Sequence, residues 1–185
     1  MTEVMQQNDI IAVLERDHQS VKAMFSRFDS ESSSRWGEMF RELTEMLVRH
    51  EVAEEEIVYP AVREDAPNGA HIADSCIHEQ SEAEEMLDRM ESEGVDSTQF
   101  PTLLAELRRS VLAHAEHEER EVFPALRAVE DAPRRLELGE RFERAKSKAP
   151  THPHPNAPDT PPGNKALGPI AALADRMRDA MRGSH

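Results

Sequence analysis

The chain has 185 residues, of which 38% are hydrophobic and 32% charged, enough for one domain with a core and a tail. A formal net charge of −15 argues against nucleic acid, whose phosphates attract Lys and Arg, and against an anionic membrane surface. No apolar run approaches the ~20 residues of a membrane span, the N-terminus has no secretory-signal pattern, and a single cysteine allows no intrachain disulfide. We therefore expect a cytoplasmic protein.

Composition and periodicity predict an all-α protein. Leu, Ala, Met, Glu and Arg dominate, all strong helix formers, and no alternating strand pattern is visible. The first helix is expected to begin at a cap of Asn8 or Asp9 and to reach Phe28, with His18 near the middle of its apolar face. A polar, serine-rich loop follows over 29–34.

The second helix is expected to start near Ser34 and to carry His50 and Glu54 on one face, because residues four apart lie one turn along. Pro60 lies inside the helical pattern and should kink the helix or end its regular part. The stretch 65–69 has the composition of a turn.

Two further helices are expected after this turn. The third covers about 70–92, with His78 among its apolar positions. The fourth opens within 98–102 and carries His114 and Glu118, again four residues apart. Four long helices joined by short turns predict an up-down-up-down four-helix bundle.

The second and fourth helices share a repeat. Residues 50–63 and 114–127 both read His-x-x-x-Glu-Glu-x-x-Val-aromatic-Pro-Ala-aliphatic-Arg. A single His-x-x-x-Glu is common on acidic helices, but its repetition with the same flanking residues indicates a pair of metal-ligand pairs. Imidazole and carboxylate donors together suit iron, and burying them without a metal would be costly. The predicted ligands of two iron ions are His18, His50, Glu54, His78, His114 and Glu118.

With these residues, the chain resembles the hemerythrin and HHE cation-binding domain family over about 8–130, especially the bacterial hemerythrin-like proteins. The resemblance implies a four-helix bundle with an oxo-bridged and carboxylate-bridged di-iron centre. It also implies a role for each predicted ligand: terminal ligands His18, His50, His78 and His114, and bridging carboxylates Glu54 and Glu118.

Two departures from the oxygen-carrying hemerythrins affect the expected chemistry. Those proteins have a second histidine four residues after the third-helix histidine, where this chain has Glu82, and His-x-x-x-x-Asp in their fourth helix. Fewer imidazoles suit reversible O2 binding less than ferric–ferrous cycling on peroxide, nitric oxide or O2. We therefore expect a peroxidase or catalase-like enzyme in defence against oxidative or nitrosative stress. The alternative is an O2 or NO sensor, or an iron-storage module, without turnover.

Several side chains near the motifs have more than one interpretation. Glu82 is a seventh ligand, a hydrogen-bonding partner of a ligand, or solvated. Tyr59 serves redox chemistry or proton delivery, or it only packs, as its equivalent Phe123 suggests. Cys76 is expected to be a buried small hydrophobe, and His117 to lie at the surface or behind a ligand. Further carboxylates orient the imidazoles or are simply solvated: Glu51, Glu55 and Glu119.

The C-terminal third has a different character. A charged helical segment is expected over 131–148, and six prolines over 149–163 predict an extended linker that we place at 149–166. A short amphipathic helix is expected over 167–182. The histidines of the linker, His152 and His154, are interpreted as spacers. This tail resembles that of actinobacterial hemerythrin-like proteins, and the pattern leaves the oligomeric state open.

Overall fold

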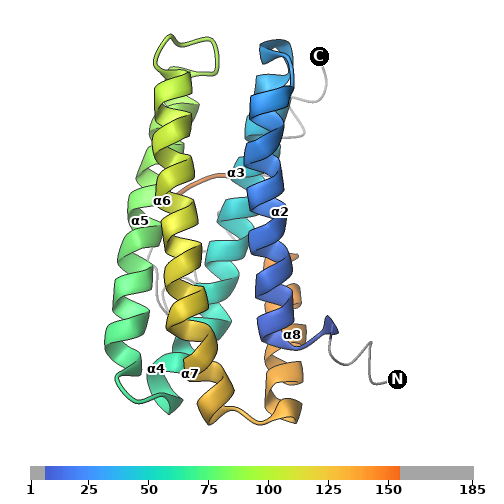
Figure 1. Ribbon diagram of the computed structural model, residues 1–185, viewed down its shortest axis with the longest axis vertical. Helices are drawn as coiled ribbons and strands as arrows, with labels where there is room; N and C mark the ends of the chain where they lie inside the picture. The colour runs from blue at the N-terminus through green and yellow to red at the C-terminus, as the bar shows by residue number, and fades with distance from the viewer. Residues whose placement is uncertain (1–6, 155–185) are drawn as a thin grey trace.

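The computed structural model describes residues 7–154, and every regular element in that range is helical, which confirms the all-α prediction. Figure 1 shows the long helices running side by side along the longest axis of the molecule. In chain order the elements are α2 (Ile10–Ser30), η1 (Ser33–Arg35), α3 (Trp36–Ala53), η2 (Glu54–Val58), α4 (Tyr59–Asp65), α5 (Gly69–Glu93), α6 (Phe100–Arg120), α7 (Val122–Val129) and α8 (Ala132–Lys146).

Helices α2, α3, α5 and α6 form the four-helix bundle expected from the sequence. Helix α2 packs on α3, α5 packs on α6, and the two pairs meet through α2 with α6 and α3 with α5. The Asp9 side chain caps α2 by accepting a hydrogen bond from the Ile11 N–H, and Gly94, with φ at 78°, ends α5. These local signals set the helix ends within two residues or so of the predicted positions.

The apolar core consists of two clusters at opposite ends of the bundle. One cluster includes Leu14 of α2 and Cys76 of α5, and the other includes Val21 and Ala83 of the same helices. Each long helix therefore has an apolar stretch on either side of a central position. The buried side chains between the stretches are polar and include one from each helix: His18, His50, Gln80 and His114.

The helix irregularities lie just before the two prolines of the repeat. Residues 54–58 form η2, a π-helical turn, and Pro60 follows in the first turn of α4. In the second copy, Glu121 separates α6 from α7, with φ at −117° and ψ at −49°. Because proline lacks an N–H and its ring crowds the preceding turn, the helix widens or breaks upstream of it. The predicted kink at Pro60 is therefore a widened turn that begins at Glu54.

The predicted segment 131–148 contains α8, which packs against α2 and α3 at the end of the bundle near α7 (Figure 1). Its Phe142 side chain is fully buried in the core. Gly139 lies so close to the backbone of Asn8 that an added Cβ would sit 2.0 Å from the Asn8 carbonyl oxygen. A glycine is therefore required where α8 meets the segment leading into α2.

The first residues of the predicted proline-rich linker pack on α5. The His152 ring is buried, with Nδ1 2.7 Å from a Glu91 carboxylate oxygen, and the His154 N–H donates to Glu84 over 2.8 Å. The predicted amphipathic helix over 167–182 lies outside the described residues. Among residues 7–154 no helix is long and apolar enough to cross a membrane.

Candidate metal centre

Four predicted ligands meet in the middle of the bundle. His18 comes from α2, His50 from α3, Glu54 from η2 and Glu118 from α6, and all four are buried. One ligand atom from each lies within 4.8 Å of the others. His114 of α6 is adjacent, with Nε2 3.6 Å from the Glu118 Oε2. The structure thus brings together five of the six predicted ligands.

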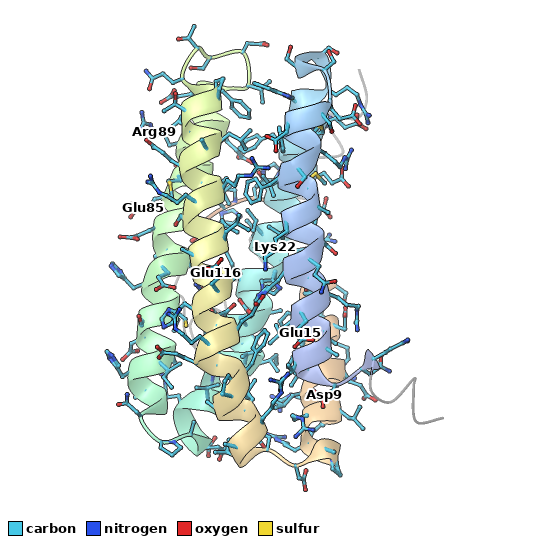
Figure 2. All side chains as sticks on the ribbon, in the orientation of Figure 1. Asp9, Glu15, Lys22, Glu85, Arg89 and Glu116 are labelled. Carbon is cyan, nitrogen blue, oxygen red and sulfur yellow. The ribbon has the colours of Figure 1, made fainter. Side chains whose placement is uncertain are left out.

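The cluster contains both His-x-x-x-Glu pairs and a contact across the bundle. His50 Nε2 is 3.0 Å from Glu54 Oε1, one turn along the same helix. His18 Nε2 reaches the other repeat and lies 3.2 Å from Glu118 Oε2. The side chains of Figure 2 fill the space between the helices, with Lys22 lying between α2 and α6. Lys22 Nζ lies 3.4 Å from Glu119 Oε1 at the edge of the cluster.

Each of the three imidazoles is held from behind by a carboxylate at its Nδ1. Asp17 Oδ2 lies 3.0 Å from the Nδ1 of His50, and Glu119 Oε1 lies 3.1 Å from that of His18. Glu79 Oε2 lies 2.8 Å from the Nδ1 of His114. A carboxylate at Nδ1 fixes the ring and the tautomer, and it leaves Nε2 directed into the cluster as a donor for a cation.

The donor atoms of the cluster test whether a cation fits. His18 Nε2, Glu54 Oε1 and Glu118 Oε2 are buried and make no hydrogen bond within the described part of the chain. His18 Nε2 and Glu118 Oε2 nevertheless lie 3.2 Å apart, and Glu54 Oε1 lies 3.0 Å from His50 Nε2. A buried polar atom without a partner costs ~1–3 kcal/mol, and more when it is charged. These three atoms belong to a buried group of four residues whose ligand atoms lie within 4.8 Å of one another, so the residues present fit a bound cation.

Burial and close charges alter the protonation of the metal-free cluster. Burial lowers the pKa of His50, but Glu54 and Asp17 outweigh it and hold that pKa well above the usual value. Burial also lowers the pKa of His114, but Glu118 and Glu79 outweigh it and raise that pKa to about 9. Burial and the neighbouring Glu118 raise the pKa of Glu54. Without a cation, therefore, His50 and His114 carry positive charge that faces these carboxylates.

His78 is not part of the cluster. Its side chain is 77% exposed, and its Nε2 lies 3.7 Å from the similarly exposed Glu82. The buried residues of α5 include Cys76 and Gln80, which are four apart and share a face. A residue two positions from either of them points about 200° away at 100° per residue. The prediction that His78 is a core ligand is corrected by its position, and Glu82 is solvated.

Gln80 occupies the place on α5 that His78 was expected to fill. Its side chain is 2% exposed, and Nε2 lies 2.7 Å from Glu54 Oε2 and 2.6 Å from the Tyr59 hydroxyl oxygen. Because a carboxylate only accepts hydrogen bonds, the amide nitrogen faces Glu54. The sequence holds one signal for this residue: Glu79-Gln80 precedes the second His-x-x-x-Glu pair as Asp17-His18 precedes the first.

Tyr59 does more than pack. Its ring is buried, and its hydroxyl donates to Glu118 Oε1 over 2.8 Å and lies 3.4 Å from Glu54 Oε2. Burial and these two carboxylates raise the phenol pKa well above its usual value, so the hydroxyl keeps its proton. Phe123, the equivalent in the other repeat, stacks on the His18 ring with 5.6 Å between ring centroids.

The other predicted side chains lie around the cluster. Glu119 contacts His18, as one interpretation held, while Glu51 is buried and has its pKa raised to about 8 by burial and by Glu84. Glu55 lines a surface pocket together with Tyr59.

A second group of potential donors lies behind His114. Cys76 is buried, as expected, and its Sγ lies within 4.8 Å of donor atoms of Glu79 and His117. His117 Nδ1 lies 2.8 Å from Glu79 Oε1, on the carboxylate that also contacts His114.

The hemerythrin HHE cation-binding domain model matches residues 9–126. The chain belongs to this family. An uncharacterized hemerythrin-like protein of Schizosaccharomyces pombe is 34% identical over 91% of this chain and 80% of its own length. A DNA nickase of Nostoc sp. is 28% identical over 77% of this chain, which spans 40% of the nickase. No solved structure matches. The HHE assignment agrees with the buried His and Glu donors, and the actinobacterial likeness of the tail stays a prediction.

Proposed function

We propose that this HHE domain holds iron in its core and uses it to decompose hydrogen peroxide. The observation that carries the proposal is the convergence of three buried donor atoms that make no hydrogen bond within residues 7–154: His18 Nε2, Glu54 Oε1 and Glu118 Oε2. With His50 they make a set of two imidazoles and two carboxylates. Such a mixed set suits iron, and the absence of cysteine from it disfavours a structural zinc site.

Iron, when bound, would supply the changes of oxidation state that a reaction with peroxide needs. In the overall reaction two molecules of hydrogen peroxide give two molecules of water and one of O2. One peroxide takes up two electrons and two protons, and the other releases them. The protein must therefore accept and return protons close to the donor set.

Tyr59 and Gln80 are the groups placed for this proton traffic. The Gln80 amide donates to Glu54 and to the Tyr59 hydroxyl, which in turn donates to Glu118. The raised pKa of Tyr59 keeps a proton on its oxygen at neutral pH. We propose that this line of hydrogen bonds holds the two carboxylates in place and offers a hydrogen bond to a reactant beside them.

Two surface pockets support access by a small molecule. A pocket of about 680 Å³ is lined by Tyr59, Pro60 and Arg63, among others, and another of about 400 Å³ by Asp17, His50 and Lys146. Each is lined in part by a residue of the cluster or its immediate partners. Peroxide, nitric oxide and O2 are all small enough to enter pockets of this size.

A measurement of O2 evolution separates turnover from binding. The protein is loaded with ferrous iron without air, freed of excess metal, and given hydrogen peroxide at a large molar excess in an O2 electrode. Repeated turnover is expected for the protein, loss of nearly all turnover for Glu54→Ala, and no loss for His78→Ala. A single equivalent of peroxide consumed would favour a binding or storage module.

The same cell with nitric oxide added tests peroxidase chemistry linked to nitric oxide. Faster peroxide loss with nitric oxide consumed in parallel would support it. The nicking of DNA belongs to the Nostoc relative, and we do not extend it to this chain, whose net charge of −15 opposes binding to phosphates.

A further inference from the structure

The centre has two halves, one on α2 and α3 and the other on α5 and α6. The supporting contacts of the two halves correspond residue by residue. In the first half, Asp17 of α2 holds the Nδ1 of His50 on α3, and the next residue, His18, points into the centre. In the second half, Glu79 of α5 holds the Nδ1 of His114 on α6, and the next residue is Gln80. Gln80 is therefore the structural counterpart of His18.

The two halves also differ in the aromatic residue beside this position. The neighbour of His18 is Phe123, which stacks on the ring and offers it no hydrogen bond through its side chain. The neighbour of Gln80 is Tyr59, whose hydroxyl lies 2.6 Å from the amide nitrogen. One half thus pairs an imidazole with a phenyl ring, and the other pairs an amide with a phenol. The second half therefore has two hydrogen-bond donors, the Gln80 amide nitrogen and the Tyr59 hydroxyl, where the first half has an imidazole nitrogen and a phenyl ring.

The oxygens of the two shared carboxylates divide between the halves. Glu54 Oε1 and Glu118 Oε2 make no hydrogen bond to any described residue and face His50 and His18. Glu54 Oε2 accepts from Gln80, and Glu118 Oε1 accepts from Tyr59. Each carboxylate therefore has one oxygen without a hydrogen bond to a described residue, beside His18 or His50, and one oxygen that accepts a hydrogen bond from the second half. The first kind of oxygen on Glu118 also lies 3.6 Å from His114 Nε2.

We propose that the centre holds one metal ion, on the His18 side, and that Gln80 and Tyr59 take the place of a second ion by hydrogen bonding the oxygens it would bind. The inference rests on the proposed metal binding and replaces the two irons that the family resemblance implied. The ion's donors are His18, His50, Glu54 and Glu118, while His114 lies outside this donor set. Gln80 Nε2 lies 3.5 Å from His114 Nε2, so the amide also occupies the approach to that imidazole.

Charge supports the same conclusion. Glu54 and Glu118 are the two carboxylates at the centre, and both are fully buried. Together they balance one divalent cation. A second divalent cation would add two further positive charges to a buried site, where uncompensated charge is costly.

Metal stoichiometry tests the proposal without reference to activity. Metal-free protein is titrated with ferrous iron without air in a calorimeter, and bound iron is measured after desalting. One ion per chain is expected. Two ions per chain would overturn the single-ion proposal and leave metal binding intact, whereas no bound ion would overturn the proposed function itself.

The double variant Gln80→His with Tyr59→Phe gives the second half the residues of the first. It is expected to bind two ions, and circular dichroism of the double variant and of each single variant checks that the bundle still folds. A folded double variant that still binds one ion would contradict the role proposed for Gln80 and Tyr59. His78→Gln is the matched control and should leave the stoichiometry at one.

Electron paramagnetic resonance gives an independent readout. After oxidation, the unaltered protein should show the signal of an isolated high-spin ferric ion. The double variant should lose most of that signal through coupling between two ferric ions. A coupled, silent pair in the unaltered protein would overturn the proposal.

Discussion

Tyr59 and Glu118 join the two copies of the repeated motif through one hydrogen bond of 2.8 Å inside the core. The phenol comes from the first copy and the carboxylate from the second, and both side chains are buried. At the equivalent position of the second copy, Phe123 has no hydroxyl to offer the carboxylate of the first. The two copies therefore differ at the point where they meet, and the site they form is asymmetric.

Removing this hydroxyl should destabilise the metal-free protein. Tyr59→Phe leaves Glu118 Oε1 buried without its donor, which costs about 1–3 kcal/mol in the free energy of unfolding. Urea denaturation of metal-free protein measures the loss. His78→Ala, at a solvated position, should change the free energy by no more than about 0.5 kcal/mol. Equal stabilities for the two variants would contradict the hydrogen bond.

Histidine substitutions should separate the cluster from the surface. His18→Ala removes a buried donor, and we expect the variant to stay helical but to lose most of its bound iron. His78→Ala should keep its iron, because that ring is solvated. Iron analysis with circular dichroism checks both variants. Iron loss from His78→Ala with retention by His18→Ala would place the metal outside the buried cluster and contradict the proposed donor set.

The carboxylates that hold the imidazoles from behind, Asp17 and Glu79, should affect iron affinity to different extents. Asp17→Asn weakens the hold on His50, a donor to the proposed ion, and should lower iron affinity by about 10- to 100-fold. Glu79→Gln makes the matching change behind His114 and should lower the affinity far less if only the first half holds an ion. Competition with a chelator measures both affinities. Equal losses would point to an ion in each half.

Metal affinity should rise with pH. The pKa of His114 is about 9 and that of His50 lies well above its usual value, so both imidazoles are protonated in the metal-free protein at pH 7. A ligand imidazole must be neutral, so binding at His50 releases a proton and the affinity increases as pH rises from 6 toward 9. Calorimetry in buffers of different ionisation enthalpy counts the protons released. An affinity that does not change over this range would contradict the protonated state.

The raised pKa of His114 also determines how the stability of the metal-free protein depends on pH. A histidine whose folded pKa is raised contributes stability that is fully present below its unfolded pKa of about 6.5 and is lost as pH rises through the folded value. For His114 that window runs from about 6.5 to about 9. Metal-free His114→Gln should lack this part of the pH dependence in urea denaturation.

The sequence by itself determined the helices and the two His-x-x-x-Glu pairs. Apolar periodicity and local caps such as Asp9 and Gly94 depend on neighbouring residues, so their consequences can be predicted locally. The spacing of His50 with Glu54, and of His114 with Glu118, is likewise a property of one turn of helix. These elements and pairs lie where the pattern placed them.

Tertiary structure decided what a single helix cannot specify. The rotation of α5 about its axis is set by packing against α4 and α6, and it turns Gln80 inward and His78 outward. The contacts of Asp17 with His50 and of Glu79 with His114 cross between helices far apart in sequence. The motif treats Tyr59 and Phe123 as equivalent aromatic residues, and only the assembled bundle sets the phenol hydroxyl against a buried carboxylate. Local spacing thus supplied the donors, and helix packing determined which of them face one another.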